Sequence, residues 1–342
     1  MRYGLFGGPI APPGVRTERE AYDEYADYVV AAERLGFASV FLTEHHFTGL
    51  GQVSSPLGLL SYLAGRTSTI RLGTAVSVLN WYNPITVAEQ AATVDLVSGG
   101  RLDFGVGRGF RAAEYEGFCI PMDEAQDRYD EALEVILKAW SSEGRWSHEG
   151  MFWRYANVVS EPRPIQQPLP PVWMGAGSEK SLRLAAERGF NLLLDQIASF
   201  ETIAERVSVY RDRQAELDMD PSKYDVAVTR GLHIVDSAAE RDQAIDDRIV
   251  AMGAIASLAK GRGDGPQNRM AADYMTDVRK STEEGTIIGD ALECAQRLDR
   301  VAESGVDYVL LSDMTSSPHV LERFTREVVP QQSAAQTAKQ LT

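Results

Sequence analysis

The sequence predicts an α/β protein, a closed (β/α)8 TIM barrel with long insertions at the face where the strands end. Three observations predict this fold. Short β-rich runs alternate with longer helical patterns along nearly all of the 342 residues, eight strand candidates can be counted, and a helical pattern follows each of them. Eight strand–helix units in a chain of this length favour a closed barrel of parallel strands over an open sheet.

The strand candidates are short runs rich in apolar and β-branched residues, bounded by polar or glycine-containing segments. In chain order they are RYGLF, ASVFLTE, IRLGTAVSV, RLDFGVG, PPVWMG, FNLLLD, DVAVTRGLHIV and VDYVLLS, at residues 2–6, 38–44, 70–78, 101–107, 170–175, 190–195, 225–235 and 306–312.

The helical candidates are longer, and their apolar residues recur at helical spacing. Each of the first seven follows a strand, one further helix leads into the last strand, and a short helix ends the series. They cover residues 19–36, 54–66, 86–97, 123–142, 179–188, 199–216, 238–258 and 290–303, and the short helix begins at Pro318.

Two connections between these elements are too long to be plain turns. Residues 143–171 carry Trp146 and Trp153 among glycines and prolines, and we expect the aromatic residues to order this segment. Residues 259–289 are rich in Gly, Lys, Arg and Asp, which fits either a mobile lid or a disordered segment. We expect one domain over residues 1–330 and a frayed polar tail over residues 331–342.

The composition limits the class of protein. With 34 basic and 49 acidic residues the net charge is −15, which repels phosphate backbones and argues against a nucleic-acid partner. No window approaches the roughly 18 apolar residues that span a bilayer, and the N-terminus does not resemble a signal peptide. Cys119 and Cys294 stand far apart and in no CxxC pattern. We therefore expect a cytoplasmic protein without disulfides and without membrane contact.

The residues that follow the strands are the candidates for chemistry, because the C-terminal ends of barrel strands face the active site. The second strand ends in Glu44, His45 and His46, a cluster that packing alone does not explain. Adjacent strand residues point to opposite faces, so His45 and His46 do not share one metal ion, and we expect no metal site. The other strand ends contribute Phe6, Ala75, Val76, Gly107, Arg108, Gly175, Gly177, Ser178, Asp195, His233, Ser312 and Asp313.

His45 admits two interpretations. It can be a hydrogen-bonded structural group, which is the commoner role of a histidine at a strand end. It can also be a neutral imidazole that takes or gives a proton near neutral pH. Glu44 can then either orient His45 or cap the loop that follows.

Two glycine-containing strand ends suit the binding of an anion. FGVGRGF, residues 104–110, is not a dinucleotide-binding fingerprint, because Phe110 stands where the third glycine belongs. Its glycines still allow a tight bend, and Arg108 adds a fixed positive charge. In WMGAGSEKS, residues 173–181, Ser178 occupies an N-cap position, so the following helix offers free N–H groups. Together they predict a clamp for a monophosphate, although an ordinary capped helix gives the same second pattern.

The chain resembles the bacterial luciferase-like, flavin-dependent monooxygenases, and among them the luciferase subunit itself. The resemblance runs from residue 2 to about residue 330. Its blocks occur in a shared order and spacing: FLTEHHFTG, RLGTAVSVL, P-x-x-x-AEQ at 84–90, GGRLDFGVGRG, EPRPIQQPLPPVWMG and AAERGF. They are specific for the family, and none of them specifies a substrate.

The resemblance implies a two-component monooxygenase that binds reduced FMN at the C-terminal face of the barrel. Oxygen would add at flavin C4a to give a hydroperoxide, which oxygenates a small apolar substrate such as an aldehyde or a ketone. His45 falls on the family's catalytic histidine, so we expect His45, with Glu44, to be catalytic and His46 to pack. No nicotinamide fingerprint is present, so a separate NAD(P)H-dependent reductase would supply the reduced flavin. A homodimer is also implied.

The resemblance assigns the cofactor site as well. A non-prolyl cis peptide between Ala75 and Val76 would support the flavin ring, and the phosphate contacts fall on Arg108, Ser178 and Ser181. The expected site further includes Gly107, Gly175, Gly177 and Gln196.

Three positions depart from the catalytic subunit of luciferase. Gly107 stands where that subunit has a cysteine, Gln196 lies near the place of a tryptophan, and Arg111 replaces an aromatic residue. These changes reshape the pocket for the flavin ring, so we expect no light emission. Two alternatives remain: a deazaflavin (F420)-dependent oxidoreductase of the same superfamily, and a non-catalytic flavin-binding partner subunit.

Overall fold

The computed structural model describes residues 1–257 and 277–332. Within these residues eight parallel strands close into a barrel, which confirms the predicted fold class. Hydrogen bonds join each strand to its neighbours, and the pairing of the first strand with the last closes the ring. In spatial order the strands are β1 (Arg2–Gly7), β2 (Ser39–Leu42), β3 (Arg71–Thr74), β5 (Leu102–Gly107), β8 (Val172–Gly175), β9 (Asn191–Leu194), β10 (Val226–Ile234) and β12 (Tyr308–Ser312).

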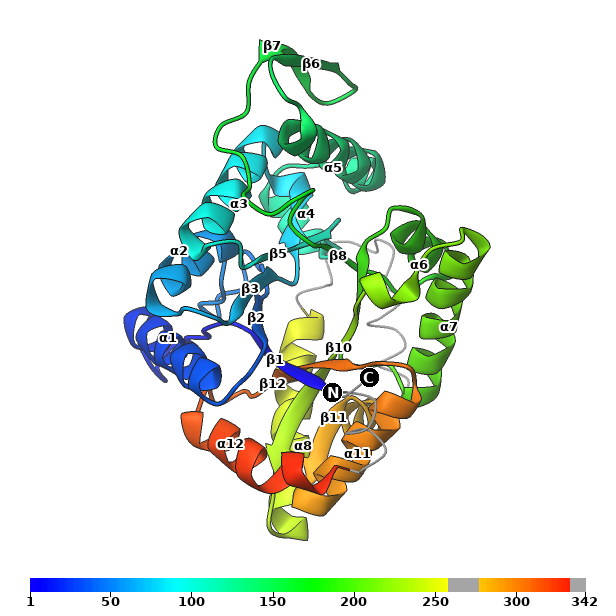
Figure 1. The fold of residues 1–342 in the computed structure, drawn as a ribbon. Coiled ribbons are helices and arrows are strands. Elements are labelled where there is room, and N and C mark those ends of the chain that lie inside the picture. The colour runs from blue at the N-terminus through cyan, green and yellow to red at the C-terminus, as the bar shows by residue number, and fades with distance from the viewer. Residues whose placement is uncertain (258–276, 333–342) are drawn as a thin grey trace.

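Helices surround this ring (Figure 1), and the predicted helices are confirmed to within two residues at the ends that the structure describes. Capping fixes several of the starts; at α1, for example, Thr17 and Glu20 form a capping box. None of the described helices combines the length and the apolar character that crossing a membrane requires. The helices are α1 (Glu18–Arg34), α2 (Pro56–Arg66), α3 (Pro84–Ser98), α5 (Ala125–Ser141), α6 (Glu179–Glu187), α7 (Phe200–Glu216), α8 (Ala238–Ser257), α11 (Ala291–Glu303) and α12 (Pro318–Arg323).

The sequence patterns missed two short helices. One is α4 (Ala112–Gly117), which follows β5, and the other is α10 (Val278–Glu284). Both have fewer than two full turns, so neither is long enough for the spacing of apolar residues to reveal it. The first of them matters for function, because it carries a residue that contacts His45.

The two long connections differ from each other. Residues 143–171 are ordered as expected, and they form a hairpin of β6 (Trp146–Glu149) and β7 (Arg154–Val158) that stands off the barrel beside α5 (Figure 1). For residues 259–289 the expectation of one lid or disordered segment is wrong in part. Residues 278–289 form α10 and β11 (Thr286–Gly289), and the buried β11 pairs with the end of β10. Its apolar residues, Ile287 and Ile288, are too few to stand out in a polar segment. Residues 258–276 lie outside the described residues.

Apolar side chains fill the middle of the barrel. Phe41 contacts Trp173 edge to face, with 5.3 Å between the ring centroids. Gly73 makes room for this packing, because a Cβ at Gly73 would lie 2.4 Å from the ring of Phe41. The same interior cluster includes Leu193, Ala227, Tyr308 and Leu310. The barrel has a packed core, as expected of this architecture, and its polar groups gather at the two ends.

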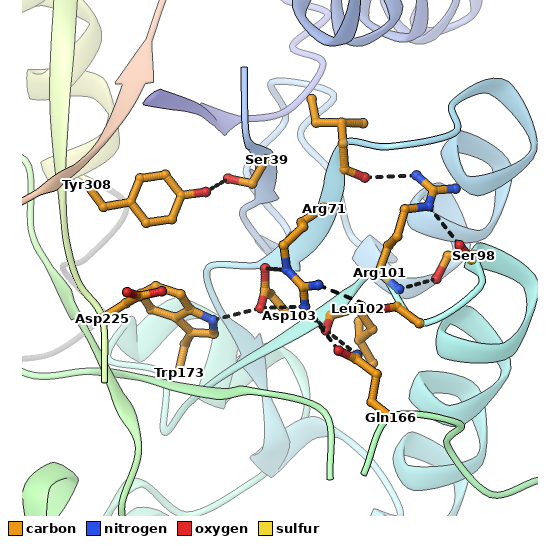
Figure 2. Close-up of polar contacts among 12 residues, drawn as sticks. Ser39, Arg71, Ser98, Arg101, Leu102, Asp103, Gln166, Trp173, Asp225 and Tyr308 are labelled. Atoms are coloured by element: carbon orange, nitrogen blue, oxygen red, sulfur yellow. Dashed lines mark hydrogen bonds and ion pairs between the residues drawn. The ribbon is translucent and has the colours of Figure 1, made fainter. Parts of the chain in front are cut away.

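Polar side chains close the N-terminal end of the barrel (Figure 2). The buried carboxylate of Asp103 accepts two hydrogen bonds from Arg71, at 2.8 and 3.0 Å, and one from the indole N–H of Trp173 at 3.1 Å. Arg101, which directly precedes β5, donates five hydrogen bonds of 2.7–3.0 Å. They reach the carbonyl oxygens of Ala64, Thr67, Ile70 and Ser98 and the hydroxyl of Thr67.

Candidate active site

The opposite, C-terminal end of the barrel gathers the residues that the sequence singled out. Glu44, His45 and His46 follow β2, the Ala75–Val76 peptide follows β3, and Arg108 follows β5. Ser178 follows β8 and begins α6, and Gln196 follows β9. Because all of these strands are parallel and hydrogen-bonded in a ring, their carboxyl ends lie at one end of the molecule.

Glu44 lies in a buried polar network that does not include His45. Its side chain accepts hydrogen bonds from the hydroxyl of Tyr82 at 2.8 Å and from the backbone N–H of Val78 at 3.0 Å. The Nε2 atom of His46 lies 3.0 Å from the same carboxylate. Burial raises the pKa of Glu44, and the hydrogen bonds from His46, Tyr82 and Val78 offset this in part. Glu44 therefore holds His46 and the loop after β3 in place, and none of its described hydrogen bonds reaches His45.

His45 contacts a different carboxylate, on the helix that the sequence patterns missed. Its Nδ1 atom lies 3.3 Å from Oε1 of Glu114, and its Nε2 atom lies 3.2 Å from Nη2 of Arg111. Arg111 and Glu114 are 1% and 2% exposed. The backbone N–H of His46 donates to the same Oε1 atom of Glu114 at 3.0 Å. His45 thus bridges a buried cation and a buried anion.

Burial and charge set the protonation of this group. Burial and the positive charge of Arg111 lower the pKa of His45, although the hydrogen bond to Glu114 acts in the opposite direction. Burial alone would raise the pKa of Glu114, but the hydrogen bonds from His45 and from the His46 backbone lower it overall. His45 is therefore neutral near pH 7, and Glu114 is ionised.

His46 packs among aromatic rings. Its ring meets Phe118 edge to face, with 4.8 Å between centroids, and Phe118 in turn stacks on Trp81 at 4.9 Å. Together with the hydrogen bond to Glu44, these contacts fix the ring of His46. The two adjacent histidines therefore have different surroundings, and only His45 has a cation beside it among the contacts described.

The peptide bond between Ala75 and Val76 is cis, as expected. Val76 lies against two of the glycines that the sequence assigned to the same site. A Cβ at Gly107 would lie 2.3 Å from Cγ2 of Val76, and a Cβ at Gly175 would lie 3.7 Å from its Cγ1. Ala75 and Val76 also pack against the interior cluster of the barrel. The three strand ends therefore meet around Val76 with small residues beside it, an arrangement we call the cradle, and a side chain at Gly107 would collide with Val76.

Positive groups lie beside this cradle. Arg108 is exposed and forms no side-chain hydrogen bond or ion pair with the described residues; only its carbonyl oxygen is engaged, by Asn80 and Tyr115. On the neighbouring strand Ser178 is the N-cap of α6, in a capping box with Ser181. The N-cap prediction is confirmed.

Arg206 of α7, which the sequence patterns did not indicate, adds a further cation near the start of α6. Its Nη2 atom lies 3.4 Å from where a Cβ would stand on Gly177, and its Nη1 atom forms an ion pair of 2.6 Å with Asp195. No sequence pattern connects a residue in the middle of a helix to this place, so only the packing of α7 on α6 brings it here.

Gln196 follows β9, the strand next to β8, and it accepts a hydrogen bond of 3.0 Å from Arg248 of α8. The guanidinium of Arg248 covers Gly231 of β10, since a Cβ there would lie 2.3 Å from its Cζ atom. His233, two residues further along β10, has a buried Nε2 atom that finds no hydrogen-bond partner among residues 1–257 and 277–332. Burial and the charge of Arg248 lower its pKa to about 4, so His233 is neutral near pH 7.

A cavity of about 630 Å³ opens on His45. Its walls come from the loop between β1 and α1 and from the loop between β2 and α2. Residues that line it include Ala11, Arg16, Thr17, His45, Phe47 and Gln52. Within residues 1–257 and 277–332 no group of three or more His, Cys, Asp or Glu side chains is arranged to hold a metal ion. The site thus combines a neutral imidazole, a cradle of small residues and cations suited to an anionic ligand.

Comparisons with known proteins agree on one family. The family model described as luciferase-like monooxygenase matches residues 1–308. A relative from Acinetobacter baylyi, the oxygenase component of a flavin-dependent trigonelline monooxygenase, is 28% identical over 96% of this chain and 95% of its own.

Solved structures are similar over almost the whole chain. A monooxygenase from Streptomyces bottropensis has a TM-score of 0.84 and 26% identity, covering 96% of this chain and 99% of its own. The oxygenating constituent of a 3,6-diketocamphane monooxygenase from Pseudomonas putida, solved with FMN, has a TM-score of 0.79. It is 19% identical and covers 97% of this chain and 99% of its own, which is a likeness of fold alone.

Proposed function

The chain belongs to the luciferase-like monooxygenase family, and we propose on that basis that it is a flavin-dependent monooxygenase. In this proposal it binds reduced FMN at the C-terminal end of the barrel and transfers one atom of O2 to a small apolar substrate, such as an aldehyde or a ketone. The relative from Acinetobacter baylyi, whose name states both a flavin and an oxygenase component, supports this class of reaction.

The observation that carries the proposal is the cradle around Val76. The cis peptide brings Val76 between Gly107 and Gly175, and any side chain at Gly107 would collide with Val76. A flat ring system needs a floor of small residues, where the backbone can approach it closely. The residues present therefore suit an isoalloxazine ring, which Ala75, Val76 and Gln196 would hold.

The phosphate of FMN would lie between the ends of β5 and β8. Arg108 supplies a cation that no described side chain neutralises, and the start of α6 supplies N–H groups at the positive end of the helix dipole. Gly177, Ser178 and Ser181 form this start, and Arg206 lies beside it. The same fold holds FMN in the Pseudomonas putida enzyme.

When bound, reduced FMN supplies the electrons that reduce O2. The contribution of this chain is then to exclude water and to move protons. His45 lines the cavity at this end of the barrel, and its neutral imidazole is suited to exchange a proton with a ligand there. Glu44, by contrast, acts through the loop that it holds, because its contacts are with Val78, Tyr82 and His46.

The proposal extends to partners. A separate NAD(P)H-dependent reductase would supply the reduced flavin, as the word component in the relative's name suggests. We propose that the chain forms a homodimer through the outer helices and emits no light. We place it in the cytoplasm, because Cys119 and Cys294 form no disulfide and suit a reducing compartment.

An anaerobic titration of the purified protein with reduced FMN tests the cofactor, followed by rapid mixing with O2 and spectroscopy of the flavin. Saturable binding and a flavin spectrum that changes with O2 before oxidised flavin forms are expected. Binding of reduced F420 in place of FMN, with turnover in the absence of O2, would instead support hydride transfer. Flavin binding with activity that appears only when a homologous chain is added would favour a non-catalytic partner subunit.

His45→Ala tests the role of the imidazole. Loss of a general acid or base lowers turnover by about 10²- to 10⁴-fold, so we expect substrate oxygenation at saturating reduced FMN to fall within that range. His46→Ala is the matched control, since it removes the adjacent histidine, and oxygenation per folded molecule should remain. Undiminished oxygenation by the His45 variant would remove His45 from the mechanism.

A further inference from the structure

Both ring nitrogens of His45 have a side-chain partner, and each partner can take only one role in a hydrogen bond, as donor or as acceptor. Nη2 of Arg111 lies 3.2 Å from Nε2, and Oε1 of Glu114 lies 3.3 Å from Nδ1. An arginine side chain only donates hydrogen bonds, and it does not lose its proton in proteins. An ionised carboxylate only accepts them.

These two partners leave one arrangement of protons on the ring. Nε2 must carry the lone pair, because a proton there would point at an N–H of Arg111. Nδ1 must carry the proton, because it faces the carboxylate of Glu114. A doubly protonated ring would satisfy Glu114 but would oppose two donors at Nε2. The geometry thus favours one neutral tautomer of His45 over both alternatives.

We propose that Arg111 and Glu114 are positioning residues that hold His45 as a neutral imidazole with its proton on Nδ1, so that proton exchange is confined to Nε2. This inference rests on the proposed function only for the use of that proton exchange in catalysis. In the proposed monooxygenase, His45 then acts as a base at Nε2, and Arg111 releases this atom when a ligand presents a proton. Neither residue needs to contact the substrate to have this effect.

The contacts around Arg111, His45 and Glu114 support this assignment. Glu114 cannot turn away easily, because the backbone N–H of His46 also holds its Oε1 atom, at 3.0 Å. Arg111 is held less firmly: Nη1 lies 3.8 Å from Glu114, and Nε and Nη1 are buried without a hydrogen-bond partner. A guanidinium with two nitrogen atoms unengaged can leave Nε2 without breaking other hydrogen bonds.

Other charged groups near His45 are arranged differently. Glu44 faces His46 and not His45. Across the cavity lie Arg16 and Glu18; the Arg16 side chain donates to the carbonyl of Ile10 and pairs with Glu24. Arg111 is thus the cation in contact with the ring among the described residues, and Arg16 provides a matched arginine nearby that does not touch it.

His46 supplies an internal comparison. Its Nε2 atom faces the Glu44 carboxylate, which also accepts from Tyr82 and Val78, so His46 carries its proton on Nε2. The two neighbouring histidines should therefore be opposite tautomers. If the contacts of the two rings had no influence on where their protons lie, the two histidines would not be expected to differ in tautomer.

The test is a two-bond ¹H–¹⁵N spectrum of the ¹⁵N-labelled protein without flavin, recorded across pH 5 to 8 and assigned through His45→Gln and His46→Gln. We expect a lone pair on Nε2 of His45 and a proton on Nε2 of His46. In Arg111→Met the titration midpoint of His45 should rise, because the positive charge beside the ring is removed. Arg111→Lys should restore part of the low midpoint, and Arg16→Met should leave it where it is in the unsubstituted protein.

A proton on Nε2 of His45 in the unsubstituted protein would overturn the proposal. An Arg111→Met midpoint equal to that of Arg16→Met would do so as well. Should Arg111→Met not fold, Glu114→Gln gives the second measurement, and it should lower the midpoint of His45 because it removes the negative charge. Since no flavin is present, a failure here is distinguishable from a failure to bind reduced FMN.

Discussion

The two ends of the barrel each bury an arginine, and the two arginines differ in how many of their donors are used. Arg101 at the N-terminal end makes five hydrogen bonds, four of them to backbone carbonyls; Figure 2 shows the one to Ser98. Arg111 at the C-terminal end makes one, to His45, and its Nε and Nη1 atoms have no hydrogen-bond partner. Arg111 is nevertheless the more buried of the two, at 1% exposed against 9%.

This difference separates the end of the barrel that stabilises the fold from the end that carries the candidate site. A buried donor without an acceptor costs about 1–3 kcal/mol, so a chain selected for stability alone has no reason to keep one. At the N-terminal end all three side-chain nitrogens of Arg101 donate hydrogen bonds, and Asp103 ties β3, β5 and β8 together. Among the described residues, the C-terminal end keeps buried polar atoms without a hydrogen-bond partner, including Nε2 of His233 and Nε of Arg111.

The largest expected effect is on the N-terminal end. Arg101→Met should lower the free energy of unfolding by about 3 kcal/mol or more, because it leaves several buried carbonyl groups without donors. Urea denaturation followed by circular dichroism measures it. The folded fraction should still bind reduced FMN with unchanged affinity. Weaker binding by that fraction would show that the two ends do not have separate roles.

A pH dependence of similar size should come from the C-terminal end. The pKa of His233 is about 4 in the folded protein and about 6.5 when unfolded. The unfolded chain therefore binds more protons between these values, and stability falls as the pH is lowered from about 6.5 to about 4, by about 3 kcal/mol at most. His233→Gln should flatten this part of the pH curve, whereas the exposed His319→Gln should not. Equal curves for the two variants would contradict the assignment.

Arg108→Ala tests the comparison between the two ends through the binding of reduced FMN. Removing one charge-assisted contact to a phosphate costs about 1.5–3 kcal/mol, so the Kd for reduced FMN should rise about 10- to 100-fold in an anaerobic titration. Stability should change little, because the side chain has no hydrogen bond or ion pair with the described residues. Arg34→Ala on the outside of α1 is the control, and an equal effect there would argue against a specific phosphate contact.

The smallest effect on stability is expected from Arg111→Met, which is the direct counterpart of Arg101→Met. Its loss should change the free energy of unfolding by no more than about 1 kcal/mol, since Nε and Nη1 of Arg111 form no hydrogen bond with the described residues and Glu114 keeps its bonds to His45 and His46. Urea midpoints of the two variants give the comparison. A loss as large as that of Arg101→Met would show that Arg111 serves the fold.

The sequence determined the ring of strands, because the patterns that encode it are local. Each run such as IRLGTAVSV carries its own β tendency, and the following helical spacing can be read within a few turns. The same locality placed Ser178 at the start of a helix and put Glu44, His45 and Arg108 at one end of the barrel. Parallel strands bring their carboxyl ends together whatever the side chains are.

Only the tertiary structure decided which side chains meet at that end. His45 contacts Glu114, 69 positions along the chain, and Glu44 beside it contacts Tyr82 instead. Arg111 and Glu114 begin a helix too short to show a period, and no local pattern says which carboxylate an imidazole will face. Such pairings depend on how loops of adjacent strands pack against each other, and packing is a property of the whole ring. The sequence thus placed the candidate residues at one end of the barrel, and the tertiary structure decided which side chains they contact.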